Sequence, residues 1–267
     1  MKPDLLLTQI KHADYPVFRL FLKRHSNFFN KIIVYFSEHN RFPYFDHFIQ
    51  TAIKEDVYEI FDYPEIVFLD PVLTDWGRED WRNKSTNEML KYSTSDWVCS
   101  VEQDFFAKDW DKLLSSVGEA MKTYDLVGWW QENNKYIHPS FWFIKRELLE
   151  KTNKDFSARD GHDHFGWITK DVERLGGKIK STQDMGFKDF ENCFHLGGVN
   201  QNYLEGLKPE FVFHRPDWFY IYNYWCRKAD VMQSPLFTEI SLKVEDRLKK
   251  MFPQINPETD NRAIYFK

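Results

Sequence analysis

Four short apolar runs, separated by longer stretches of helical character, constrain the fold of this chain more than any other feature. The runs are DLLLTQI (4–10), KIIVYF (31–36), EIVFLD (65–70) and WVCSV (97–101). Between the first two runs, Phe18, Phe21 and Leu22 recur at helical spacing after a helix start at Asp14. Continuous apolar strands that alternate with amphipathic helices are typical of a parallel sheet covered on both faces. We therefore predict an α/β fold with a mostly parallel sheet flanked by helices.

The rest of the chain is less regular. Before the fourth run, Ser85 and Glu88 have the spacing of a capping box, which predicts a helix that begins at Ser85. After it we expect helices near 108–122, 163–177 and 238–252, and strands at 124–130 and 138–148. The last helix has an apolar stripe made of Ile240, Val244, Leu248 and Met251. We predict a main domain over residues 1–205 and a C-terminal helical, aromatic extension over 206–267 that packs on it.

Composition excludes several classes of protein. The net charge of −5 argues against a general nucleic-acid binder, which normally shows a basic face. Three cysteines, odd in number and far apart, indicate neither a disulfide framework nor a zinc site. No apolar stretch is long enough for a membrane span. We therefore expect a soluble protein of a reducing compartment, the cytoplasm. Aromatic residues make up 18% of the chain, and such a surplus suits surfaces that stack on sugars or bases.

Two carboxylates, Glu102 and Asp104, follow the fourth apolar run directly. In open α/β sheets, ligands bind beyond the carboxyl ends of the strands. Carboxylates one residue apart in a turn can converge on a hard divalent cation that also carries phosphate oxygens. The alternative is a solvated polar turn. The position of the pair favours a metal site.

Three segments, in order along the chain, resemble the GT-A-fold glycosyltransferases, in particular the family 2-like group. In STNEMLKYSTSDWVCSVEQDFFAKDWDKLL, Asn87, the step Ser95-Asp96-Trp97 and the pair Glu102-x-Asp104 fall on the family's helix-opening Asn, strand-opening step and DxD motif, with Glu in place of the first Asp. GHDHFGWITKDVERLGGKI (161–179) resembles the later acidic motif that precedes a helix, and FHLGG (194–198) resembles a His-containing segment. The resemblance covers about residues 4–200. It implies a GT-A nucleotide-sugar-binding and catalytic domain.

The resemblance also implies roles for particular residues. Asp104, Glu102 and His195 would hold Mn²⁺ or Mg²⁺, which assists departure of the diphosphate from a nucleotide-diphosphate sugar. Asp163 would be the general base, with Asp160 in reserve, and a single displacement would invert the anomeric configuration. A purely structural role stays open for two of them: Asp163 could be a helix N-cap, and His195 could be a histidine at a strand end that is hydrogen-bonded to backbone.

Contacts to the two substrates follow from the same resemblance. For the nucleotide sugar the candidates are Thr8, Gln9, Glu38, Arg78, Arg82, Asn87, Gln103 and Trp130. For the acceptor they are Trp218, His214 and Arg215. Taken singly, the first group could be surface residues and the aromatic ones could belong to the core.

Other functions stay open at this point. A nucleotidyltransferase shares the strand order, but TQIKHADYP lacks the glycines of its usual loop after the first strand. A non-catalytic carbohydrate- or nucleotide-binding protein could keep the same scaffold. For a hexosyl- or pentosyltransferase, the default acceptor is a glycan. A hydroxymethylated base in DNA is conceivable with Arg215, Arg227 and Lys228, but the pI of about 6.0 disfavours it.

Overall fold

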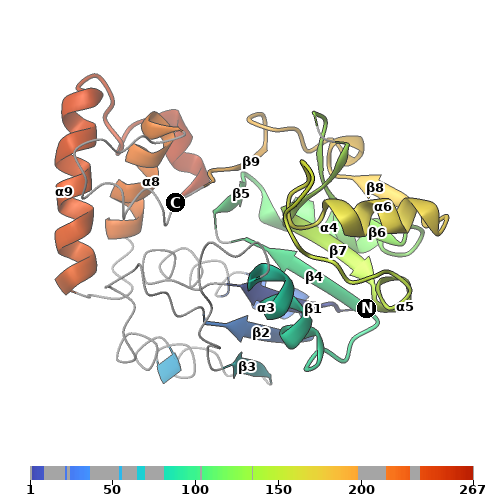
Figure 1. The fold of residues 1–267 in the computed structure, drawn as a ribbon. Helices are drawn as coiled ribbons and strands as arrows, with labels where there is room; N and C mark the ends of the chain where they lie inside the picture. Colours follow the sequence, from blue (N-terminus) through green and yellow to red (C-terminus); the bar gives the residue numbers. More distant parts are fainter. Residues whose placement is uncertain are drawn as a thin grey trace.

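A computed structural model describes most of the 267-residue chain. The described residues are 2–8, 22, 25–36, 54–55, 65–69, 81–102, 104–133, 135–197, 215–228 and 235–266. Within them, seven strands form one sheet in the order β3-β2-β1-β4-β7-β6-β8, and two more strands pair separately as β5-β9 (Figure 1). The predicted helix that starts at Asp14 lies mostly outside the described residues.

The first half of the large sheet is parallel, as the apolar runs predict. Its strands are β1 (Asp4–Thr8), β2 (Lys31–Tyr35), β3 (Ile66–Leu69) and β4 (Trp97–Val101). Strand β1 pairs in parallel with both β2 and β4, and β2 pairs in parallel with β3. All five residues of β2 and of β4 are buried, because the sheet is covered on both faces. The predicted mostly parallel α/β fold is therefore confirmed.

The second half of the large sheet adds three strands, one of which, β7, runs antiparallel to its neighbours. They are β6 (Leu126–Gln131), β7 (Tyr136–Lys145) and β8 (Ile179–Ser181). Strand β7 pairs antiparallel with both β4 and β6, whereas β6 and β8 are parallel. The predicted strand 138–148 is wrong at its end, because the short helix α5 (Arg146–Leu149) begins there.

Helices cover the two faces of the sheet. Helix α4 (Trp110–Ala120) packs on one face together with Leu5 and Val34. Helices α3 (Trp81–Leu90) and α6 (Gly166–Arg174) pack on the other face, in the cluster that contains Leu6 and Ile33. None of the helices in the described part of the chain is both long and apolar enough to cross a membrane.

The predicted start of α3 at Ser85 is wrong. The helix begins at Trp81, and Ser85 lies in its middle. There the Ser85 hydroxyl donates to the carbonyl of Arg82 at 3.2 Å, which is a back-bond within the helix and not an N-cap.

The C-terminal helices pack beside the small sheet. Strands β5 (Phe105–Ala107) and β9 (Cys193–His195) pair antiparallel, and they lie between the large sheet and helices α8 (Pro216–Lys228) and α9 (Pro235–Met251) (Figure 1). Phe106, Phe194, Val244 and Leu248 share one buried cluster. Met251, predicted on the same stripe as Val244, is instead 50% exposed, because it lies at the end of α9. Short 3-10 helices occur at Ser26–Phe28, Gln183–Met185 and Asn261–Tyr265.

Asp4 anchors the first residue of β1 to the turn that precedes β4. This fully buried carboxylate accepts hydrogen bonds at Oδ2 from the Ser93 hydroxyl (2.8 Å), Thr94 N (2.5 Å) and Ser95 N (2.8 Å). Asn30 donates to its other oxygen at 2.8 Å. Asp4 thereby joins β1 to the turn that enters β4.

Candidate active site

Glu102, Asp104 and His195 meet at the carboxyl end of β4. After Val101 the chain turns, with Glu102 N donating to the Ser140 carbonyl of β7 at 2.8 Å. Strand β5 then pairs with β9 so that Phe105 lies opposite His195, and Leu196 N donates to the Asp104 carbonyl at 2.8 Å. The pairing of the small sheet therefore places His195 beside the two carboxylates, although it lies 91 positions after Asp104.

The three side chains are close enough to share one cation. His195 Nε2 lies 3.0 Å from Asp104 Oδ1 and 3.1 Å from Glu102 Oε2. One atom of each side chain lies within 4.8 Å of those of the other two. The three side chains are 13% to 17% exposed, so solvent reaches them without surrounding them.

Positive groups balance the carboxylates. Arg82 Nη1 lies 2.6 Å from Glu102 Oε1. Burial by itself would raise the pKa of Glu102, but Arg82 and His195 outweigh it and hold that pKa well below its usual range. Burial would lower the pKa of His195, but the Asp104 and Glu102 carboxylates outweigh it and raise that pKa to about 10.

The donor set fits a divalent cation. Two carboxylates and one imidazole are ligands that Mn²⁺ accepts, and hard cations add water or phosphate oxygens. Since a histidine binds metal only as the neutral ring, a cation would replace the proton of His195 as the positive charge between the carboxylates.

Asp163, in the loop before α6, is connected to this cluster through His138, whose ring lies near both Asp163 and His195. Its backbone N donates to the Tyr136 hydroxyl at 3.1 Å, and its Oδ1 accepts from His164 N at 2.7 Å. The N-cap of α6 is Phe165, so the alternative role of Asp163 as that cap is not observed. Its side chain is 40% exposed and is therefore accessible from solvent.

Two histidines missing from the sequence-based candidates flank Asp163. His138 Nε2 lies 3.9 Å from Asp163 Oδ2, and His164 Nε2 lies 3.8 Å from Asp163 Oδ1. The His138 ring is also 5.0 Å from the His195 ring, centroid to centroid. Burial first, and the neighbouring His195 second, lower the pKa of His138 to about 4; for His164, burial and Arg82 lower the pKa to about 4. The alternation of polar and apolar residues over 138–148 predicts a strand, but it does not predict that the His138 side chain lies near the cluster.

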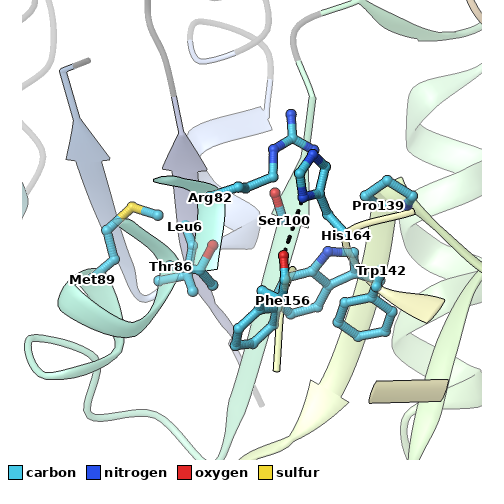
Figure 2. A pocket seen from close by; sticks show the side chains of 10 residues that line it. Leu6, Arg82, Thr86, Met89, Ser100, Pro139, Trp142, Phe156 and His164 are labelled. Carbon is cyan, nitrogen blue, oxygen red and sulfur yellow. Dashed lines mark hydrogen bonds between the residues drawn. The ribbon is translucent and has the colours of Figure 1, made fainter. Parts of the chain in front are cut away.

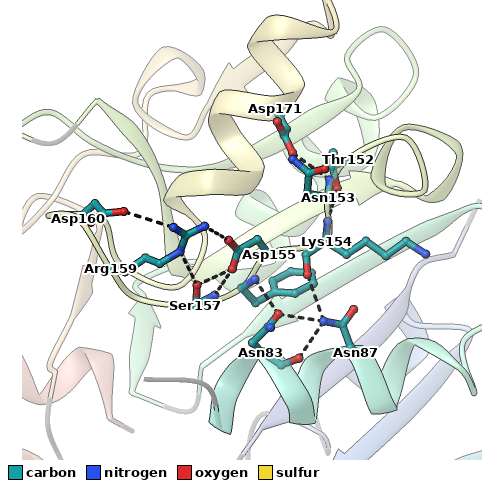
Figure 3. A network of polar contacts seen from close by, with 11 residues as sticks. Asn83, Asn87, Thr152, Asn153, Lys154, Asp155, Ser157, Arg159, Asp160 and Asp171 are labelled. Atoms are coloured by element: carbon teal, nitrogen blue, oxygen red, sulfur yellow. Dashed lines mark hydrogen bonds and ion pairs between the residues drawn. The ribbon is translucent and has the colours of Figure 1, made fainter. Parts of the chain in front are cut away.

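The reserve base Asp160 lies on an exposed turn. Arg159 and His162 exchange two backbone hydrogen bonds of 3.0 and 2.9 Å around Asp160 and Gly161, which both have positive φ. The Asp160 side chain is 66% exposed and contacts Arg159 at 3.3 Å (Figure 3). The geometry favours Asp163 over Asp160 as the carboxylate near the cluster.

Among the nucleotide-sugar candidates, Arg82 joins the cluster and two others take part in packing. Asn87 Nδ2 donates to Asn83 O and Oδ1, both at 2.9 Å, and to Lys154 O at 3.1 Å, so it ties α3 to the loop before α6 (Figure 3). Trp130 is partly buried and packs against the core cluster that contains residues of α3 and α6. Thr8 ends β1, opposite Tyr35. Gln9, Glu38, Arg78 and Gln103 lie outside the described residues.

Trp129, and not its neighbour Trp130, lies beside the cluster. The centroid of its ring is 5.0 Å from that of His138 and 6.1 Å from that of His195. The sequence-based candidate was Trp130. Because the register of β6 shifts between Gly128 and Trp130, strand alternation does not predict which of the two neighbouring rings faces the cluster.

Of the acceptor candidates, Arg215 contacts the cluster at His195, and Trp218 packs on the residue that precedes His195 in the sequence. Arg215 donates to the carbonyl of His195, and its guanidinium lies 4.6 Å from the Phe190 ring centroid. Trp218 packs on Phe194, with ring centroids 4.4 Å apart. His214 lies outside the described residues.

A cavity lies next to the cluster, between α3 and the segment that leads to α6. Its lining includes Arg82, Ser100 and His164, together with the apolar Leu6 and Trp142 (Figure 2). The His164 Nδ1–H donates to the Phe156 carbonyl at 3.1 Å, which holds that ring at the wall. Arg82, which pairs with Glu102, links this cavity to the cluster.

The fold of this chain is similar to that of a solved glycosyltransferase. The mannosyltransferase PcManGT from Pyrobaculum calidifontis, in complex with GDP-Man and Mn²⁺, superposes with a TM-score of 0.51 at 14% identity, over 96% of this chain and 76% of that chain. The chain has the GT-A fold. The fold predicted from the GT-A resemblance is therefore confirmed.

Weaker similarities are to other GT-A structures. TarS of S. aureus (residues 1–349) matches with a TM-score of 0.46 at 10% identity, over 95% of this chain and 92% of that chain. Glucosyl-3-phosphoglycerate synthase from Mycobacterium tuberculosis, in complex with Mn²⁺, UDP and phosphoglyceric acid, matches with a TM-score of 0.42 at 10% identity, over 67% of each chain. No family model matches the sequence, and no curated protein does.

Proposed function

We propose that this GT-A protein is a metal-dependent glycosyltransferase that moves a sugar from a nucleotide-diphosphate sugar to an acceptor hydroxyl. The observation that carries the proposal is the convergence of Glu102, Asp104 and His195 within 4.8 Å at the end of β4. The presence of GDP-Man and Mn²⁺ in the similar PcManGT supports the same pair of ligands here.

The three residues would hold the cation from one side. When bound, the cation would offset the negative charge that collects on the departing diphosphate. Arg82 keeps Glu102 in its ionised form through the 2.6 Å ion pair. The contacts predicted for Thr8, Gln9, Glu38, Arg78, Asn87, Gln103 and Trp130 with the nucleotide sugar remain part of the proposal.

Asp163 would act at the other substrate. A hydroxyl attacks the anomeric carbon faster if a carboxylate removes its proton as the bond forms. The 40% exposed Asp163 is beside the cluster but is not one of its three members. One carboxylate base and one displacement imply inversion at the anomeric carbon.

The acceptor is proposed to be a glycan, held in part by the C-terminal extension. Arg215 touches His195 from that extension, and Trp218 lies close by. DNA is the less favoured acceptor, since a net charge of −5 opposes phosphate contacts. We also keep the cytoplasm as the proposed location.

A ligand screen tests the proposal. The protein is heated with UDP-, GDP-, CMP- and dTDP-sugars, each with and without Mn²⁺, and the unfolding temperature is recorded. We expect one nucleotide class to raise the unfolding temperature only with Mn²⁺, and Mn²⁺-dependent release of nucleotide from that sugar. Stabilisation by none of them, together with no nucleotide release, would refute the proposal.

A further inference from the structure

His138 has one ring nitrogen whose role is fixed by its own strand. The Ser140 backbone N–H points at His138 Nδ1 with an N–N distance of 3.2 Å, and the Ser140 hydroxyl oxygen lies 2.7 Å from the same atom. A backbone N–H is only a donor, so Nδ1 must supply a lone pair. The neutral ring therefore carries its proton on Nε2.

That Nε2–H faces the carboxylate proposed as the base. The distance from His138 Nε2 to Asp163 Oδ2 is 3.9 Å, which is too long for a direct hydrogen bond. One oxygen atom placed between them can lie about 2.8 Å from both atoms, the usual length of such bonds. The oxygen of a bound hydroxyl group at that place would accept a hydrogen bond from His138 Nε2–H and donate one to Asp163 Oδ2.

We propose that His138 and Asp163 together bind the attacking hydroxyl, with His138 as a further catalytic residue of the transferase. The hydroxyl proton passes to the Asp163 carboxylate while the oxygen forms its bond to the anomeric carbon. The bond from that carbon to the diphosphate oxygen breaks, and its electron pair leaves with the diphosphate. His138 keeps its proton throughout and donates to the attacking oxygen, which it orients. This inference rests on the proposed transferase function.

Two other roles for His138 conflict with the geometry. As a base at Nε2 the ring would need its proton on Nδ1, where it would meet the Ser140 N–H donor at 3.2 Å. As a metal ligand it would belong with the three clustered side chains, but among the described residues that cluster consists of Glu102, Asp104 and His195. A hydrogen-bond donor to substrate is the role that both contacts of the ring allow.

A pair of amide variants separates this role from a structural one. In His138→Asn the side-chain oxygen can still accept from Ser140 N–H, but no N–H reaches the position of Nε2. In His138→Gln the amide nitrogen lies near that position. A role in packing alone would favour Asn or treat the two alike, whereas the proposed donor role favours Gln.

The experiment uses water as the nucleophile, so that the acceptor need not be known. Hydrolysis of the nucleotide sugar selected by the thermal screen is measured with Mn²⁺, and the Kd of the nucleotide with Mn²⁺ is measured by calorimetry. We expect kcat in His138→Asn to fall about 100-fold, as for the loss of a contact that orients a reacting group. In His138→Gln it should fall less than about tenfold, with the nucleotide Kd unchanged in both.

The outcomes distinguish a failure of the proposed role of His138 from a failure of the proposed transferase function. Wild-type kcat in His138→Asn, or equal losses in the Asn and Gln variants with nucleotide binding intact, would overturn the role of His138 and leave the transferase function standing. Failure of the wild-type protein itself to bind or hydrolyse any nucleotide sugar would instead overturn the proposed function.

Discussion

Arg82 and Glu102 form an ion pair that joins helix α3 to the end of β4. The Arg82 Nη1 atom lies 2.6 Å from Glu102 Oε1, and the two side chains are 18% and 13% exposed. A carboxylate withdrawn from water keeps its charge only when a partner compensates it. Arg82 thus stabilises the charged form of Glu102 by a contact within the protein.

Removing Arg82 should destabilise the fold. In Arg82→Met, Glu102 loses one of its two positive partners and keeps only His195, and breaking such a buried pair costs roughly 3 kcal/mol. Urea unfolding of the two proteins measures the difference. Arg82→Lys keeps a positive charge and should be affected less. Equal stability of wild type and Arg82→Met would show that the ion pair does not hold α3 to β4.

Asp163→Asn should lose turnover and keep binding. Since the amide cannot accept the proton of the attacking hydroxyl, we expect kcat to fall roughly 10²-fold or more, while the affinity for nucleotide with Mn²⁺ is unchanged. Asp160→Asn makes the same chemical change on the exposed turn and should retain activity. If Asp160→Asn is the inactive variant, the choice of base is wrong.

Asp4→Asn should destabilise the protein without altering its chemistry. The amide has one acceptor oxygen where the carboxylate has two, so its N–H groups would face either the Asn30 amide or the donors that now meet Asp4 Oδ2, namely the Ser93 hydroxyl and the backbone of Thr94 and Ser95. A buried mismatch of this kind costs about 2 kcal/mol or more. Asp96→Asn, in the same turn but exposed, is the control and should unfold like wild type.

The contact between Asp125 and Lys145 should make stability depend on acid pH. Asp125 Oδ1 accepts from Lys145 Nζ at 2.6 Å, and Oδ2 accepts from Lys178 N at 2.9 Å. Burial opposes ionisation, but these donors outweigh it and lower the pKa of Asp125 below its ordinary value of 3.8. A pKa depressed by folding stabilises the native state above the unfolded pKa, and this contribution is lost as pH falls through the folded pKa.

Two unfolding series measure this effect. At pH 7, Asp125→Asn should be less stable than wild type by about 1 kcal/mol, since the pair is partly exposed. The difference should begin to shrink below about pH 4, where Asp125 of the unfolded chain takes up its proton, and should vanish below the lowered pKa of native Asp125. A difference that stays constant down to pH 2 would exclude this linkage.

The parallel half of the sheet could be predicted from the sequence because its central strands are buried on both faces. Strands covered on both faces, such as β2 and β4, read as continuous apolar runs. The start of α3 was missed because its first turn, WRNK, has no apolar stripe, and Ser85 instead bonds within the helix.

The candidate site was only partly readable for a different reason. Glu102 and Asp104 follow a buried strand, which is a local signal. The position of His138 depends on β7 running antiparallel to β4, with Glu102 N bonded to Ser140 O, and a buried strand carries no mark of its direction. Long-range pairing, not local pattern, brings His138 beside His195 and Asp163.

Binding of Mn²⁺ to wild type and to Asp104→Asn, followed by the electron paramagnetic resonance signal of free Mn²⁺, tests the central claim most directly. With GDP or UDP present, wild type should bind one Mn²⁺, and Asp104→Asn should bind it at least about tenfold more weakly, as expected when one of three protein ligands is lost. Equal Mn²⁺ affinity in the two proteins would contradict a metal site at the end of β4.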